Sequence, residues 1–137
     1  MCNSWYFGGG RNPAVHTNRI DYVTIASQGN ATDFGDQSRA FMASGGMSSS
    51  TRGIFAGGYA PSLPDLDMEY IQISTLGNAL DFGDLFTGAY YSGTVSSPVR
   101  GVYAGGNNTP SPFSSGSATN RIDYIQIILK KLFMQQK

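Results

Sequence analysis

The sequence predicts an all-β fold of many short antiparallel strands, and three observations support this prediction. The 137 residues include 18 Gly and 6 Pro, which disfavour long helices and favour turns. Aromatic residues, which suit strands, make up 12% of the chain, and charged residues only 13%. The chain also repeats itself with a fixed period, and each copy contains a stretch of alternating apolar and polar positions.

The repeat can be followed without gaps over most of the chain. The phrase FGGG at Phe7 returns as FAGG at Phe55 and as YAGG at Tyr103, so the two intervals are equal and define the period. Residues 7–53 and 55–101 are identical at 19 of 47 positions, and NATDFGD at 30–36 returns as NALDFGD at 78–84. The chain therefore contains at least two copies of one structural unit.

A third copy begins on schedule and then slips by six residues. The phrase NRIDYVTI at Asn18 returns as NRIDYIQI at Asn120, and the insertion lies in NNTPSPFSSGSAT, whose composition suits a loop. After Ile127 the copy stops, and the tail ILKKLFMQQK fits a helix or a further strand equally well. We expect a single repeat domain, 1–137, with repeats at approximately 5–52, 53–100 and 101–127 and a divergent C-terminal tail at 128–137.

Each unit predicts four short strands. In the second unit RGIFAGG is a compact apolar run that ends in a Gly pair, and MEYIQIS alternates as a half-buried strand does. LGNALDFGDL begins with a Gly-Asn turn, and GAYYSGTVSS is rich in the small residues found where backbones approach closely. These strands are expected within 52–58, 68–74, 76–85 and 88–97. Four strands in about 48 residues are typical of a β-propeller blade.

The unit resembles the kelch-like repeat, whose landmark is a Gly-Gly doublet that closes the second strand of a blade. The units are similar to kelch-like repeats of tail and other structural proteins of marine phages, including cyanophages, and the resemblance extends to Ile127. Two features depart from the kelch pattern. First, Phe34 and Phe82 stand where a Trp is usual, and Trp5 lies instead at the start of a strand. Second, the chain opens on strand two of a blade, so the first blade lacks its inner strand.

The resemblance implies about three four-stranded antiparallel blades per chain, which is too few to close a ring. Known propellers use typically four to eight blades. An open stack would expose apolar faces and sheet edges, which invite association. We therefore expect closure between chains, with a homodimer that forms a six-bladed ring favoured.

The bulk properties exclude several classes of function. Nine acidic residues balance nine basic ones, the six Arg are scattered, and all three Lys lie in the last ten residues, so no nucleic-acid-binding stripe is present. One Cys and one His disfavour a disulfide framework and a zinc site. No apolar run reaches 18 residues and no signal-peptide pattern opens the chain, so we expect no membrane partner and no secretion signal.

The remaining motifs have structural explanations. DFG matches a kinase motif, but the other kinase motifs are absent. The paired Asp residues at 33, 36, 81 and 84 supply too few oxygen ligands for Ca²⁺, so we expect these Asp residues to cap turns. The Gly triplet at 8–10 is explained by close packing or positive φ. Arg52 and Arg100 would pair with Asp36 or Asp84 of a neighbouring blade or face solvent. The recurring Tyr22, Tyr70 and Tyr124 favour packing between blades over a sugar platform.

Three loops, at 11–18, 59–67 and 107–119, differ from one another while the strands agree, which is a common design for binding. Their candidate binding residues are Arg11, Asn12, His16, Tyr59, Asn107 and Asn108, although a lone loop His most often faces solvent. No arrangement of acid, base and nucleophile indicates an enzyme, and no cofactor or metal is expected. The sequence predicts a non-enzymatic phage-type structural or adhesion protein, found in the virion or the infected bacterial cytoplasm, that binds itself, other virion proteins or host-surface glycans. The alternative is a lectin-like propeller module, binding carbohydrate or protein, that is not part of a virion.

Overall fold

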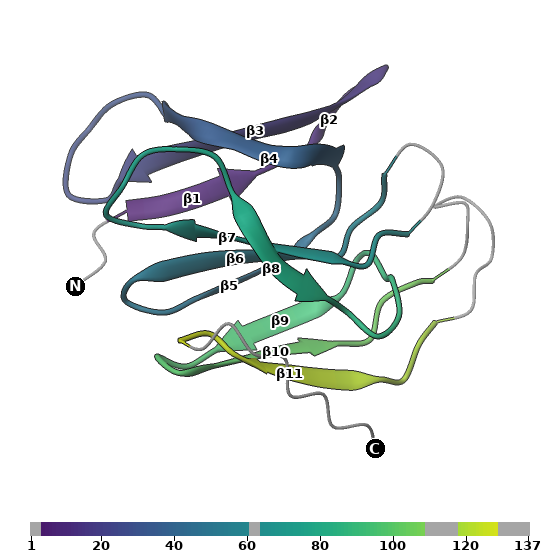
Figure 1. Ribbon diagram of the computed structural model, residues 1–137. Coiled ribbons are helices and arrows are strands. Elements are labelled where there is room, and N and C mark those ends of the chain that lie inside the picture. Colours follow the sequence, from purple (N-terminus) through teal and green to yellow (C-terminus); the bar gives the residue numbers. More distant parts are fainter. Residues whose placement is uncertain (1–3, 61–63, 109–117, 129–137) are drawn as a thin grey trace.

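The protein consists of short β-strands in antiparallel sheets (Figure 1). The computed structural model describes residues 4–60, 64–108 and 118–128, and no helix occurs within these ranges. In chain order the strands are β1 (Ser4–Gly8), β2 (Arg11–Asn12), β3 (Val15–Thr24), β4 (Thr32–Phe41), β5 (Gly45–Ser48), β6 (Arg52–Ala56), β7 (Asp67–Gln72), β8 (Leu80–Asp84), β9 (Gly93–Ser96), β10 (Arg100–Ala104) and β11 (Ile122–Gln126). The all-β prediction is confirmed, and the tail at 129–137 lies outside the described residues.

The strands form three sheets that follow one another along the chain. In the first sheet β3 lies between β1 and β4, and β2 folds back on the start of β3. The second sheet has β5, β6, β7 and β8 side by side in chain order, and the third has β9, β10 and β11. Figure 1 shows the second sheet between the other two.

The period of the sequence sets both the positions of the strands and their pairing. β1, β6 and β10 begin at residues 4, 52 and 100, and each pairs antiparallel with the next long strand of its sheet. The cross-strand pairs are equivalent in all three sheets: Tyr6 with Tyr22, Ile54 with Tyr70, and Val102 with Tyr124. The identities found in the sequence therefore mark equivalent places in space.

The sheets are offset from the sequence repeats by one strand. A strand was expected within 88–97, and the structure forms β9 only at Gly93–Ser96, where it pairs with β10 of the third sheet and not with β8. β5 likewise pairs with β6. The last strand of each sequence unit therefore begins the next sheet. Among the described residues β1 pairs only with β3, so its other edge has no strand beside it.

The repeated DFGD phrase forms a β-bulge. In the first sheet Ile20 pairs with Gly35 and Asp21 pairs with Asp33, so Phe34 is an extra residue between them. The second sheet repeats the irregularity around Phe82. The bulge turns both Phe rings into buried positions, and Gly35 adopts a φ of 150°, which a side chain disfavours.

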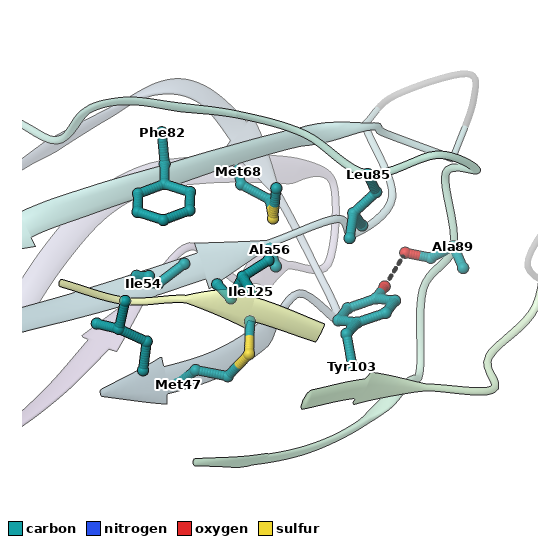
Figure 2. Packing of buried hydrophobic residues seen from close by; sticks show 10 residues of the cluster. Met47, Ile54, Ala56, Met68, Phe82, Leu85, Ala89, Tyr103 and Ile125 are labelled. Atoms are coloured by element: carbon teal, nitrogen blue, oxygen red, sulfur yellow. Dashed lines mark hydrogen bonds between the residues drawn. The ribbon is translucent and has the colours of Figure 1, made fainter. Parts of the chain in front are cut away.

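Two apolar cores lie between successive sheets. The first consists of Ile20 and Phe34 from the first sheet and Phe55 and Ile71 from the second, with Tyr6, Tyr22 and Ala79 packed against them. The larger core lies between the second and third sheets (Figure 2) and consists of Met47, Ile54, Ala56, Met68, Phe82, Leu85, Ala89, Tyr103, Ile125 and Ile127. Burial of each large apolar side chain contributes roughly 1.5–3 kcal/mol, so packing between sheets is a main source of stability.

Candidate binding surface

The described parts of the loops that differ between repeats lie at one end of the three sheets, which Figure 1 shows on the right. Isolated bridges connect two of these loops to the end of the preceding repeat: Tyr59 to Met42, and Asn107 to Tyr90. The Gly pairs that close β1, β6 and β10 turn the chain into these loops, and all six glycines have positive φ. The expectation of positive φ at the Gly doublets is therefore confirmed.

Three of the predicted binding residues lie in one row across this end. The His16 ring lies 6.4 Å from the Tyr59 ring, which in turn lies edge-on at 5.2 Å to the ring of Tyr90. Tyr90 exchanges two backbone hydrogen bonds with Asn107, at 2.9 and 3.1 Å. Tyr90 is fully buried and links the second loop to the third, a role that no sequence pattern indicated because Tyr90 was expected inside a strand.

Tyr91 presents its ring to solvent beside this row. Its ring lies 5.3 Å from that of Tyr90, and the residue is 66% exposed. Its φ of 56° is left-handed, and Ala43, the equivalent residue one period earlier, has a φ of 57°. Such a conformation costs a non-glycine residue about 1 kcal/mol or more. The fold therefore holds an exposed aromatic ring in a strained but repeated turn.

A charged cluster lies next to the second loop. The Arg39 guanidinium binds the carboxylates of Asp65, at 2.8 Å, and of Asp67. Desolvation by burial lowers the pKa of Arg39, but the hydrogen bond to Asp67 and the nearby carboxylates outweigh it and raise this pKa above its ordinary value. Glu69 accepts the Ser38 N–H at 3.0 Å, so acidic side chains of the second sheet hold the last strand of the first. These ionic contacts are structural, and they fix the second loop on its neighbour.

The other predicted binding residues flank this row, since Arg11 pairs with His16 across β2 and β3 and Asn108 follows Asn107 in the chain. Arg11 and Asn12 form β2 at the tip of a hairpin, where the Arg11 guanidinium donates to Pro13 O at 3.2 Å. Asn108 is exposed next to Asn107. Residues 61–63 and 109–117 of the predicted loops lie outside the described residues.

Two side chains of the first sheet have buried polar atoms without hydrogen-bond partners among the described residues. One is His16, through its Nε2 atom, and the other is Gln37, through both polar atoms of its side chain. Gln37 is buried, and the equivalent residue of the second repeat is the buried Leu85. A polar amide therefore occupies a position that holds an apolar side chain in the next repeat. An unsatisfied buried amide destabilises the fold.

The structure also corrects or confirms the structural expectations for the repeated motifs. Among the described residues, Arg52 and Arg100 do not pair with Asp36 or Asp84; each guanidinium lies 4.9 Å from a Tyr ring of its own sheet, Tyr70 or Tyr124. Arg100 is exposed, as the solvent-facing alternative expected. Asp33 caps its own turn by accepting the Gly35 N–H at 3.1 Å, as expected. Tyr22 and Tyr70 pack against the two cores, as expected for packing between sheets.

A groove of about 310 Å³ lies at the opposite end, beside the unpaired edge of β1. Its lining includes Trp5 and Tyr6 of β1, Met47 of β5 and Ile54 of β6. Within the described residues no group of three or more His, Cys, Asp or Glu side chains forms a metal-binding cluster. None of the described elements is a helix long and apolar enough to cross a membrane.

Comparison with known proteins identifies a likeness of fold. No protein-family model and no curated protein matches this chain. The fold matches 105 solved chains, among them the structure of YjhT, with a TM-score of 0.77 and 15% sequence identity. The match covers 97% of this chain and 42% of the YjhT chain, so this chain spans about two-fifths of that protein's length. The three-sheet arrangement therefore occurs within a larger solved protein.

Proposed function

We propose that this chain is a non-enzymatic, phage-type structural or adhesion protein, built from propeller blades, that binds its target through the loop end and assembles as a homo-oligomer. The sequence repeats resemble kelch-like units of phage structural proteins. The sheets supply a regular scaffold, and the loops at one end supply variation.

The observation that carries this proposal is a cluster of aromatic and amide residues at the loop end. Loop residues from three different repeats, His16, Tyr59 and Asn107, are held together there by Tyr90, and both Tyr59 and Tyr90 are buried beneath the surface. Tyr91 adds an exposed ring with a hydroxyl group. A rigid ring with one apolar face and one polar tip suits contact with a sugar or with a protein surface. A host-surface glycan is the ligand class that we favour.

A glycan array tests this proposal directly. The labelled protein is applied to immobilised bacterial-surface oligosaccharides, together with two alanine variants of matched exposure. Tyr91→Ala removes a ring that is 66% exposed at the loop end, and Leu76→Ala removes a side chain that is 65% exposed in the connection between β7 and β8, at the other end of the second sheet. We expect selective binding that Tyr91→Ala weakens about tenfold or more and Leu76→Ala leaves unchanged. Equal binding by both variants would refute the loop-end site.

The alternative, a lectin-like module outside any virion, uses the same loop end and differs in location. Mass spectrometry of purified virions distinguishes the two proposals. Peptides of this chain at stoichiometric levels support the structural role. Their absence from virions, combined with glycan binding by the pure protein, favours the lectin-like module.

A further inference from the structure

The two ends of the sheet stack expose faces that are equivalent to faces buried inside it. Each sheet has a leading face, which packs on the next sheet, and a trailing face, which packs on the preceding one. The leading faces contain the side chains equivalent to Tyr6, Ile20 and Tyr22, and the trailing faces contain those equivalent to Phe7, Val23 and Ile25. The trailing face of the first sheet and the leading face of the third have no described sheet against them.

Residues at equivalent positions of the repeat show how much more exposed these two outer faces are than the matching faces inside the stack. On the trailing face Phe55 and Tyr103 are 9% and 5% exposed, whereas Phe7 of the first sheet is 53% exposed. On the leading face Ile20 and Met68 are completely buried, whereas Ile122 of the third sheet is 59% exposed. The described sheets therefore leave one trailing face and one leading face without a sheet against them. Inside the chain, a leading face always packs on a trailing face.

We propose that the leading face of the third sheet binds the trailing face of the first sheet in a second copy of this chain. Two such contacts, related by a twofold axis, would close a ring of six sheets. This inference rests on the propeller architecture in the proposed function and adds the partner and the surface that contacts it. The YjhT chain, to which the fold is similar, is about 2.3 times as long as this one, as the ratio of 97% to 42% gives.

The apolar partners across the new contact follow from the equivalent contacts inside the chain. Met47 of the second sheet lies against Gly101 of the third, where an added Cβ would come within 2.6 Å of the Met47 sulfur. The equivalent residues between copies are Val95 and Trp5, both exposed. A smaller side chain thus meets a larger one, and Trp is among the residues that most often anchor interfaces.

The same backbone carbonyl accepts a hydrogen bond across both contacts inside the chain, from a different donor in each. The carbonyl of Ile73 accepts from the Tyr6 hydroxyl of the preceding sheet at 3.2 Å, and the equivalent carbonyl of Ile127 accepts from the Arg52 Nη1 atom at 3.0 Å. Ile25 is the equivalent residue on the first sheet, and Arg100 is the equivalent of Arg52 on the third. Arg100 is exposed and lies over the Tyr124 ring in the position that Arg52 holds over Tyr70. The Arg100 guanidinium would therefore donate to the Ile25 carbonyl of the second copy.

Light scattering after size exclusion tests the contact. The expected mass is about 29 kDa, twice the 14.6 kDa of one chain. Phe7→Asp places a charge on the trailing face and Ile122→Asp on the leading face, and each should weaken the dimer about 30-fold or more. Leu76→Asp, at an exposed apolar residue in the connection between β7 and β8 of the second sheet, is the control and should remain a dimer.

Mixing the two variants tests the head-to-tail arrangement. Neither Phe7→Asp nor Ile122→Asp can form a contact with itself, but a mixed pair retains one intact contact and should form an open dimer. Both substituted residues are exposed in the single chain, so circular dichroism should show native strands in each variant. A monomeric wild type, a dimer in either single variant, or no dimer on mixing would overturn the proposal.

The two experiments distinguish a failure of this contact from a failure of the adhesion role. A monomer that binds glycans through Tyr91 would overturn the contact between copies, and the homo-oligomer with it, but not the adhesion role. A dimer that passes the mixing test but binds nothing at the loop end would overturn only the adhesion role.

Discussion

The contact between the first and second sheets at Gly35 allows a sharp test of the packing. The segment 77–79 of the second sheet docks on the bulge of the first sheet through three hydrogen bonds. They run from Gly77 N to Phe34 O at 3.0 Å, from Ala79 N to Asp36 O at 2.8 Å, and from Asp36 N to Asn78 Oδ1 at 3.1 Å. A Cβ atom at Gly35 would lie within the contact distance of the Gly77 carbonyl carbon, at 2.5 Å. Gly35→Ala must therefore push the segment away.

Gly83, the equivalent residue of the next repeat, is a matched control for this substitution. It occupies the same place in the second bulge with a φ of 134°, and no described atom lies within 4 Å of its added Cβ. Both substitutions carry a backbone strain of roughly 1–2 kcal/mol. Gly35→Ala also loses up to three hydrogen bonds at about 1 kcal/mol each. We therefore expect it to lower the free energy of unfolding by about 2–3 kcal/mol more than Gly83→Ala does.

Urea unfolding followed by circular dichroism measures this difference. For a domain of this size, about 3 kcal/mol corresponds to a decrease of roughly 10 °C in the melting temperature, so thermal unfolding gives a second readout. A Gly35→Ala variant no less stable than Gly83→Ala would refute the docking of segment 77–79 on the bulge.

Three further substitutions test buried or strained groups by the same measurements. Gln37→Leu, which introduces the residue found at the equivalent Leu85, should stabilise the fold by about 1–2 kcal/mol because it removes an unsatisfied buried amide. Tyr91→Gly should stabilise it by up to about 1 kcal/mol because glycine tolerates a φ of 56°. Tyr103→Phe loses the 2.6 Å hydrogen bond to Ala89 O and should cost about 1–2 kcal/mol at neutral pH. Burial raises the pKa of Tyr103 above 10.0 in the folded protein. The stabilisation from the protonated Tyr103 hydroxyl is therefore fully present below pH 10 and is lost as the pH rises through the pKa of the folded state. Tyr103→Phe should therefore lose less stability than the wild type as the pH rises above 10. A Gln37→Leu variant that is less stable than the wild type, or a Tyr91→Gly variant that is no more stable, would contradict these assignments. So would the same dependence of stability on pH above 10 in Tyr103→Phe and the wild type.

The sequence predicted the repeated strands well because their side chains recur at fixed spacing. The period placed β1, β6 and β10 at equivalent positions, and the alternation of MEYIQIS marked β7. The period alone did not place β9 beside β10, because a periodic chain looks the same wherever the unit is taken to begin. The kelch resemblance did imply it, since a chain that opens on strand two leaves the first sheet without its inner strand, and β1 pairs only with β3 among the described residues.

The loop end was predicted in part. His16, Tyr59 and Asn107 were predicted as binding residues because they lie in loops that differ between repeats, which is a common design for binding. The structure brings these three residues together. Tyr91 was missed because a left-handed φ at a non-glycine residue has no signal in the sequence. Arg39 was missed because its partners Asp65 and Asp67 lie in another repeat, and Thr87 replaces it in the second copy.

The one-strand offset between repeat and sheet bears on how such a chain can change its length. Between β1 and β9, any segment that is one period long contains one strand of each of the four repeated kinds, whichever residue it begins at. A gene duplication or deletion of that length therefore needs no particular breakpoint, since every strand at the new junction still meets a neighbour of the right kind. The number of sheets can grow or shrink by recombination while the contacts between sheets stay as they are.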